Sequence, residues 1–229
     1  MRKIDRYDIL EFLSQREDIT MLAENAELVH VANVIRRTVA GCREDEAEPC
    51  NGSDDAVNLN EQEKRAAECW AKGSGCWIPI ADVFTLGVPG PSGSEADTYI
   101  SPMGQVFKSN NLMHCNDSII VALERFVYYN FLFPDSAYKF VGFTGFDGRS
   151  VYPLVCQQYI KGGIPATLNE IDCYMAALGF EKIEKGRYEN DSFLISDILP
   201  KNVLKDETGD YYVIDAEIKL KNSNLSSCD

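Results

Sequence analysis

The fold is decided by the stretch Phe193-Leu-Ile-Ser-Asp197-Ile-Leu-Pro-Lys-Asn202-Val-Leu-Lys205, in which four residues separate an Asp from an Asn. Apolar residues on both sides predict short buried strands, at 193–195 leading in and at 203–204 leading out. Turn-forming residues follow at 206–210, and residues 211–214 are typical of the return strand of a hairpin that ends at Asp215. A loop, a hairpin and a carboxylate at a strand end would bring Asn202 and Asp215 together.

These side chains match what phosphoryl transfer from a nucleotide requires. One carboxylate orients the acceptor hydroxyl, while an amide and a second carboxylate hold Mg2+ on the nucleotide phosphates. The Asp-x4-Asn spacing alone has low specificity, because Asp55 and Asn60 share it in a polar segment without apolar flanks. The alternative is an ordinary hairpin with surface carboxylates, and the flanking sequence does not decide between the two.

Composition excludes several classes of protein. A length of 229 residues predicts one or two domains with enough apolar content for a core. The net charge of −14 opposes binding to nucleic acid. No apolar run reaches the roughly 18 residues that a membrane span needs. The N-terminus lacks the apolar stretch of a secretory signal, so we expect a cytoplasmic protein with reduced thiols.

The metal-binding residue types do not form a recognisable zinc site. The eight cysteines include no C-x2-C pair, and the histidines His30 and His114 are too few for a His-based site. Cys156 and Cys173 lie within apolar patterns, and we expect both to be buried as small hydrophobic residues.

Residues 1–75 are predicted to form a separate helical extension. Its apolar residues repeat at helical spacing at Leu28, Ala32, Ile35 and Val39. Gly41 is a plausible helix stop, residues 42–60 are acidic and predict a flexible loop, and residues 61–72 predict another helix. We favour a packing appendage over a protein-binding extension.

From Trp77 the pattern changes to strands. Residues 81–87, 97–101 and 105–108 are predicted as three antiparallel strands, with a Gly/Pro-rich turn at 88–94. Such a turn would suit a nucleotide lid, although it lacks a G-x-G-x-x-G motif and its specificity is low.

Lys108 ends the third of these strands, and Glu124 lies in the helix that follows. A lysine on a strand and a glutamate on the next helix can form an ion pair that holds the lysine on nucleotide phosphates. For either residue alone, an ordinary exposed charge is the usual case.

The remaining sequence predicts two more strands, a joint and a helix. The strands are 138–145 and 151–159, and Lys161-Gly-Gly163 predicts a flexible joint after them. Thr167-Leu-Asn-Glu170 is a capping box that begins a helix, and Gly179 fits its end.

Four longer motifs carry a resemblance to a known family. They are Val106-Phe-Lys108-Ser-Asn-Asn, Asn130-Phe-Leu-Phe-Pro134, Ala166-Thr-Leu-Asn-Glu-Ile-Asp-Cys-Tyr-Met175 and Ile195-Ser-Asp-Ile-Leu-Pro-Lys-Asn-Val-Leu204. Together they resemble the predicted serine/threonine/tyrosine kinases found in polyvalent proteins of bacterial mobile elements, over residues 76–217.

The resemblance implies an α+β, protein-kinase-like fold with two lobes and MgATP between them. Residues 1–75 would be the extension, 76–160 an N-lobe with an antiparallel sheet, and 161–229 a truncated, minimal C-lobe. Lys108 would contact the ATP phosphates, with Glu124 orienting it, and Asp197 would be the catalytic base. Asn202 and Asp215 would bind Mg2+, and Gln157, Gln158 and Tyr159 would line the adenine side.

The chain departs from the usual kinase pattern at two places. Ile195-Ser196 replaces the His-Arg that precedes the catalytic Asp in most protein kinases, which is similar to small-molecule kinases. Ala216-Glu217 follows Asp215 in place of Phe-Gly. The hydroxyl acceptor, a protein or a small molecule, therefore stays open.

Two other functions remain alternatives. One is a non-catalytic, kinase-like module that binds a partner, and the other is a transferase that moves the nucleotide, which nothing in the sequence singles out. An apolar face left uncovered by a short C-lobe would favour self-association.

Overall fold

The computed structural model describes residues 19–44, 52–91, 93–146 and 150–221. The described residues divide into two compact units. One, the sheet unit, draws on Glu17–Val127 and Tyr138–Tyr159, and the other, the hairpin unit, draws on Tyr128–Ala137 and Ile160–Asp229. Antiparallel strand pairs predominate in both units, so the fold is α+β.

A six-stranded sheet forms the centre of the sheet unit, with the order β1-β5-β6-β4-β3-β2. The strands are β1 (Trp77–Pro79), β2 (Val88–Pro89), β3 (Ala96–Ile100), β4 (Gln105–Asn110), β5 (Lys139–Phe146) and β6 (Ser150–Gln158). Strand β1 is parallel to β5, whereas the other neighbours are antiparallel. The predicted antiparallel sheet is thus present, with one parallel strand added at its edge.

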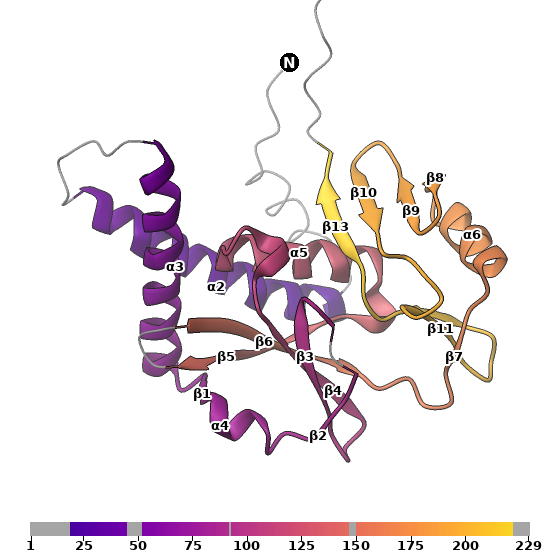
Figure 1. The fold of residues 1–229 in the computed structure, drawn as a ribbon, viewed down its shortest axis with the longest axis horizontal. Coiled ribbons are helices and arrows are strands. Elements are labelled where there is room, and N and C mark those ends of the chain that lie inside the picture. Colours follow the sequence, from indigo (N-terminus) through magenta and orange to yellow (C-terminus); the bar gives the residue numbers. More distant parts are fainter. Residues whose placement is uncertain (1–18, 45–51, 92, 147–149, 222–229) are drawn as a thin grey trace, which may run out of the picture. The chain divides into compact units, whose positions relative to one another are not determined.

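Helices cover both faces of this sheet. They are α2 (Ile19–Glu44), α3 (Gly52–Ser74), α4 (Ile80–Val83) and α5 (Ile119–Leu132), with a 3-10 turn η1 (Met113–Cys115) before α5. Figure 1 shows α4 on one side of the sheet, and α2 and α5 on the other. On the α4 side, Val83 packs with Tyr99, Phe107 and Leu154 in a buried apolar cluster.

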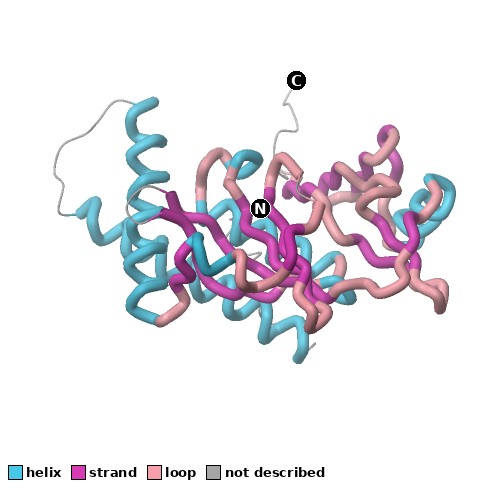
Figure 2. The backbone as a smooth tube through the Cα atoms, turned by 60° about the horizontal axis from the view of Figure 1, so that its bottom comes forward, coloured by secondary structure: helices cyan, strands magenta, loops and turns pink. Residues whose placement is uncertain are grey.

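Residues of α3 pack against β5, the strand next to the edge strand β1. The Trp70 ring lies 6.1 Å from the Phe140 ring and 6.2 Å from the Phe143 ring, centroid to centroid. The long helices α2 and α3 stand out as cyan coils in Figure 2. Helix α3, within the predicted extension, therefore packs against the sheet of the sheet unit.

The hairpin unit contains two small sheets and one helix. Its elements are η2 (Pro134–Ser136), β7 (Ile164–Pro165), α6 (Leu168–Ala177), β8 (Glu181–Glu184), β9 (Arg187–Glu189), β10 (Phe193–Ser196), β11 (Val203–Lys205), β12 (Tyr211–Val213) and β13 (Glu217–Leu220). The first sheet has the order β13-β10-β9-β8, and the second has the order β12-β11-β7. The predicted hairpin is β11 and β12, whose first pair is Val203 with Val213.

Helix α6 begins and ends as its sequence predicts. The Thr167 side chain accepts a hydrogen bond from the Glu170 backbone, and the Glu170 carboxylate accepts one from the Thr167 backbone at 2.8 Å. At the other end, Gly179 has a φ of +81°. The Phe180 N–H bonds to the Met175 carbonyl and the Gly179 N–H to the Ala176 carbonyl, which is the Schellman arrangement.

The strand predicted at 81–87 is wrong. Residues from Ile80 to Val83 form helix α4, and a turn follows in which the Thr85 and Leu86 N–H groups bond to the carbonyls of Asp82 and Val83. The apolar residues of this segment recur every three residues, at Ile80, Val83 and Leu86, which suits a helical turn better than a strand.

The boundaries predicted in the extension are also wrong. Helix α2 continues past Gly41 to Glu44, and α3 begins at Gly52, within the segment predicted as a loop. Residues 45–51 of that segment lie outside the described residues. Polar composition misled the prediction, because the start of α3 has no apolar stripe of its own.

One of the two predicted buried cysteines is exposed. Cys156 on β6 is buried in the apolar cluster, as expected, and burial raises its pKa. Cys173 on α6 is exposed, because it lies on the outer side of a helix whose buried residues are Ile171 and Met175.

Candidate active site

Asp197 follows directly after strand β10 and has a left-handed backbone, with a φ of +62°. Asp and Asn adopt this conformation more readily than most residues with a side chain. The chain turns sharply here, so that the Ile198 N–H bonds to the carbonyl of Gly186 and the Leu199 N–H to that of Asp197. The left-handed turn thus ends the strand and presents the Asp197 carboxylate on a loop.

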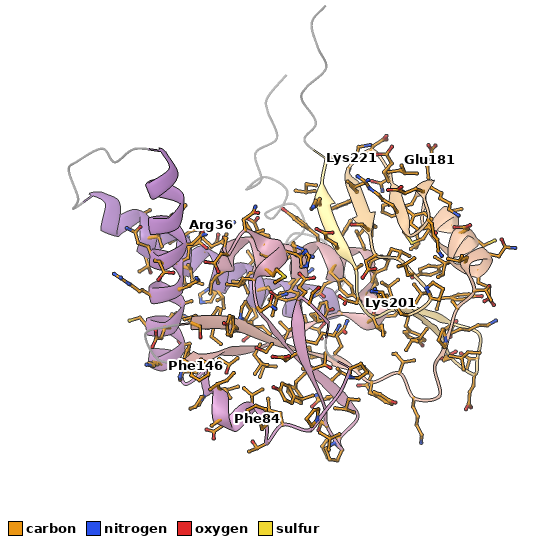
Figure 3. The ribbon with its side chains drawn as sticks, viewed as in Figure 1. Arg36, Phe84, Phe146, Glu181, Lys201 and Lys221 are labelled. Carbon is orange, nitrogen blue, oxygen red and sulfur yellow. The ribbon has the colours of Figure 1, made fainter. Side chains whose placement is uncertain are left out.

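Asn202 and Lys201 hold this loop from its other end. The Asn202 side chain is buried, and its Nδ2 donates to the carbonyl oxygen and to Oδ2 of Asp197, both at 2.8 Å. Lys201 Nζ donates to the same Oδ2 at 3.0 Å. Figure 3 labels Lys201 on the loop that follows β10. Since the amide nitrogen of Asn202 is used, its Oδ1 is the atom available to accept or to bind a cation.

The β11–β12 hairpin brings Asp215 to the same end of the loop. The Ile214 N–H bonds to the Asn202 carbonyl at 2.8 Å, which extends the hairpin by one pair beyond Val203 and Val213. Asp215 is the next residue and is exposed. The predicted metal ligands Asn202 and Asp215 therefore flank one end of the hairpin, and Asp197 is bonded to the first of them.

Two buried hydroxyls fix the strand that carries Asp215. Ser136 Oγ donates to the Val213 carbonyl at 2.5 Å, and the Tyr129 hydroxyl donates to the same oxygen. Both residues are buried, and Tyr129 lies in the part of α5 that belongs to the hairpin unit. Long-range contacts therefore support the local network at Asp215.

The donor atoms at this end of the hairpin fit a magnesium ion. An amide oxygen of Asn202 and a carboxylate of Asp215 are hard oxygen ligands, which Mg2+ prefers. Among the residues described, no group of three His, Cys, Asp or Glu could hold a metal ion. This is compatible with Mg2+, because that ion is usually bound by one or two protein carboxylates, with water and substrate phosphates completing its shell.

Two pockets of the hairpin unit lie away from these residues. One has a volume of about 350 Å³ and is lined by Asp135, Tyr174, Gly209, Asp210, Tyr211 and Tyr212. Burial and the nearby Asp135 carboxylate raise the pKa of Tyr174. Since Asp197, Asn202 and Asp215 do not line this pocket, the hydrogen bonds and not a cavity define the candidate site.

In the sheet unit, Lys108 lies on β4 between Thr98 and Val155 of the neighbouring strands. Its neighbour Phe107 faces the α4 side of the sheet, so Lys108 faces the opposite side, because side chains alternate along a strand. Lys108 Nζ donates to the Tyr138 hydroxyl at 2.9 Å, and the Tyr138 ring packs on Phe126 of α5 at 5.0 Å between centroids. Lys108 thus points toward the side covered by α5.

Glu124 lies in α5 and is buried. Its Oε1 forms an ion pair with Arg36 of α2. Arg36 was not predicted as a site residue, because nothing nearby in the sequence distinguishes it from Arg37, which is exposed. Its position on the same helical face as Ala32 and Ile35 is the signal that could have suggested an inward orientation.

Of the three residues predicted to line the adenine side, Gln157 and Gln158 end strand β6 and Tyr159 follows it. Gln157 is buried, whereas Gln158 and Tyr159 are exposed. The Tyr159 N–H bonds to the Gly104 carbonyl at 3.0 Å, so one edge of this segment is paired toward β4. Pairing with β5 on the other edge ends at Cys156, before all three residues.

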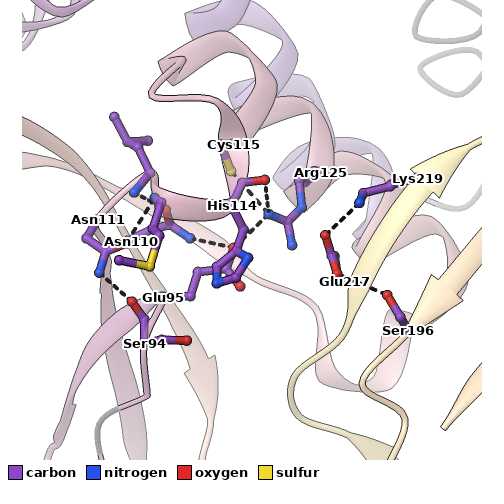
Figure 4. Close-up of polar contacts among 12 residues, drawn as sticks. Ser94, Glu95, Asn110, Asn111, His114, Cys115, Arg125, Ser196, Glu217 and Lys219 are labelled. Carbon is purple, nitrogen blue, oxygen red and sulfur yellow. Dashed lines mark hydrogen bonds and ion pairs between the residues drawn. The ribbon is translucent and has the colours of Figure 1, made fainter. Parts of the chain in front are cut away.

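The Gly/Pro-rich turn is anchored to α5. Arg125 Nη1 bonds to Glu95 at 2.7 Å and to the His114 carbonyl at 3.3 Å, and Asn111 Nδ2 donates to the Ser94 carbonyl (Figure 4). The turn between β2 and β3 therefore ends in contacts with the same helix that carries Glu124.

Strand β13 supports the other end of the Asp197 loop. Ser196 Oγ donates to Glu217 at 3.0 Å, and Ser196 pairs with Glu217 across β10 and β13 (Figure 4). The small residue before Asp197 thus has a structural partner in the strand after Asp215.

Comparisons with known proteins identify the family. No curated protein matches the chain, and no helix in the described ranges is long and apolar enough to cross a membrane. A family model described as the serine/threonine/tyrosine kinase found in polyvalent proteins matches residues 60–222. The matched residues include both the Lys108 strand and the Asp197 loop. Because the match spans most of the sequence, the chain belongs to the family of serine/threonine/tyrosine kinases found in polyvalent proteins.

Proposed function

We propose that this chain transfers the γ-phosphate of ATP to a hydroxyl acceptor, with Asp197 as the catalytic base. The observation that carries the proposal is the network in which Asn202 bonds to Asp197 while Ile214, the neighbour of Asp215, bonds to Asn202. An ordinary hairpin has no need for a buried amide that bridges its end to a left-handed Asp. Kinase-type phosphoryl transfer uses this combination of one base, one amide and one further carboxylate.

The Asp197 carboxylate accepts the proton of the acceptor hydroxyl as the acceptor oxygen forms its bond to the γ-phosphorus. The bond from that phosphorus to the β–γ bridging oxygen breaks, and ADP leaves with the electron pair. Lys201, which bonds to Oδ2 of Asp197, places a positive charge beside the base. Positioning supplies most of the acceleration, because this reaction asks little covalent chemistry of the protein.

Asn202 and Asp215 would hold Mg2+ through oxygen atoms. When bound, the ion offsets the negative charge of the phosphate oxygens. In the sheet unit, Lys108 would contact the phosphates, and Glu124 would orient it. Gln157, Gln158 and Tyr159 would line the adenine side, at the end of β6.

The proposal is tested by measuring phosphate transfer from labelled ATP in the presence of Mg2+, to the chain itself and to a panel of hydroxyl-bearing acceptors. Asp197→Ala and Asp215→Ala should each abolish transfer, and Asp215→Ala should also weaken MgATP binding. Turnover like that of the unsubstituted chain in either purified, folded variant would refute the assignment.

The ion pair of Glu124 with Arg36 favours a second candidate, a non-catalytic kinase-like module, because it gives Glu124 a structural purpose. A thermal-shift titration separates the two candidates. Stabilisation by ATP only when Mg2+ is present supports the enzyme, since a ligand that binds the folded state raises the unfolding temperature. The absence of any nucleotide effect supports the module.

A further inference from the structure

Helix α5, which carries Glu124, is capped by a residue from another helix. Glu63 of α3 is buried, and its Oε2 accepts hydrogen bonds from Ser118 Oγ at 2.7 Å and from the Ile120 N–H at 3.3 Å. The first N–H groups of a helix have no partner within the helix, and the positive end of the helix dipole favours a carboxylate there. Glu63 therefore fixes the start of α5 from outside.

The turn that leads into α5 is held by the same helix. Asn116 and Asp117 both have a left-handed backbone, with φ values of +52° and +60°. Lys64 Nζ contacts Asp117 at 2.6 Å, and Asn60 Nδ2 donates to the Asn116 carbonyl at 2.8 Å. Two successive residues in this conformation need support from their surroundings, and α3 provides it.

Arg36 of α2 holds α5 one turn further along. The Glu124 side chain is 4% exposed and that of Arg36 is 16% exposed, so their ion pair is largely removed from water. A buried carboxylate that loses its cation is strongly disfavoured. Arg36 Nη1 also donates to Asn33 Oδ1 at 3.3 Å within α2, which orients the guanidinium. Arg36 therefore compensates the negative charge of Glu124 and restricts the direction of its side chain.

We propose that α2 and α3 form a brace that sets the position of α5, and that Arg36 is the positioning residue that orients Glu124 toward its role with Lys108. This inference rests on the proposed phosphotransferase function. The residue lies in the extension, outside the residues that the family model matches. Activity would therefore depend on a segment that precedes the kinase-like part of the chain.

A double-mutant cycle tests whether Arg36 acts through Glu124. The variants are Arg36→Gln, Glu124→Gln and the double substitution, with Arg37→Gln as the control on an exposed neighbour of the same helix. Coupled residues show interaction energies that correspond to roughly 2- to 150-fold effects, and we expect about a tenfold loss of kcat/KM for ATP in Arg36→Gln. The double variant should be no worse than Glu124→Gln, whereas Arg37→Gln should behave like the unsubstituted chain. Arg36→Lys, which keeps the charge, should recover part of the loss.

Unchanged kcat/KM in Arg36→Gln, or losses that simply multiply in the double variant, would overturn the inference while leaving the proposed function intact. Amide hydrogen exchange gives a second readout that does not need catalysis. In Arg36→Gln, the amides of residues 119–127 should exchange faster, while those of α6 should not change. If the unsubstituted chain transfers no phosphate, the proposed function fails alone, and unaltered exchange in α5 would then refute the brace as well.

Discussion

The two units hold their candidate catalytic residues in different ways. In the hairpin unit, Asp197 is bonded to Lys201 and Asn202, which are four and five residues away. In the sheet unit, Lys108 is bonded to Tyr138, 30 residues away, and Glu124 to Arg36, 88 residues away. The side-chain partners of Asp197 therefore lie in its own loop, whereas tertiary packing brings Lys108 and Glu124 to theirs.

This difference decides what a substitution does. A short loop that supplies its own partners can lose a functional side chain with little effect on distant parts of the fold. A buried ion pair between two helices cannot lose a side chain without a loss of stability, because removing one partner leaves the other charge without compensation. We therefore expect the two units to differ in how far activity and stability can be separated.

The largest effect is expected at the Asp197 loop. Asp197→Asn keeps the shape of the side chain but removes the base, and should lower phosphate transfer by at least a hundredfold, since general bases contribute about 10²–10⁴-fold. Its midpoint of thermal unfolding should stay close to that of the unsubstituted chain. Asp191→Asn, an exposed carboxylate shortly before β10, is the matched control. A large loss of stability in Asp197→Asn would break the distinction between the units.

The next effect is expected at the cap of α5. Glu63→Ala removes a buried acceptor from Ser118 and Ile120, and should lower the free energy of unfolding by about 1–3 kcal/mol. Urea denaturation measures it. Glu61→Ala, on a more exposed residue of the same helix, should stay within about 0.5 kcal/mol. Equal losses of unfolding free energy in the two variants would show that the cap from α3 does not stabilise α5 more than an exposed residue of the same helix does.

A smaller effect is expected at the capping box of α6. Thr167→Ala removes the acceptor for the Glu170 N–H and should cost about 1 kcal/mol of stability. Asn169→Ala, an exposed position in the first turn of the same helix, is the control, and both variants can be compared by urea denaturation. A cost in Thr167→Ala as large as that of Glu63→Ala would mean that local contacts stabilise the fold as much as the long-range cap does.

The smallest effect is a pH dependence at Glu170. The backbone N–H of Thr167, together with Lys205 and the Thr167 hydroxyl, lowers the pKa of Glu170 from 4.5 to about 2. A carboxyl group whose pKa is lower in the folded state stabilises the fold above its unfolded pKa, and this stabilisation is lost as the pH falls toward the folded pKa. The stability difference between the chain and Glu170→Gln should therefore be full at pH 6 and shrink as the pH falls from 4.5 toward 2. Urea denaturation of both proteins at a series of pH values measures this difference in the free energy of unfolding. A difference that stays constant between pH 6 and pH 2 would contradict the assignment.

The same contrast explains what could be predicted from the sequence. The Asp197 loop, the β11–β12 hairpin and both ends of α6 were predictable because turn, capping and spacing rules act over a few residues. Arg36 was not, since its partner Glu124 is 88 residues away and only the tertiary fold joins them. The start of α3 was missed because residues 52–60 are mostly polar and were predicted as a loop.

The left-handed backbone at Asp197 limits which amino acids can occupy that position. Glycine, asparagine and aspartate tolerate such a φ value, whereas β-branched residues do not. In a saturation library at position 197, a selection for soluble, folded protein should therefore recover all three, while a selection for phosphate transfer should recover aspartate alone. Comparing the amino acids recovered in the two selections would separate the requirement for a left-handed backbone at position 197 from the requirement for a catalytic carboxylate.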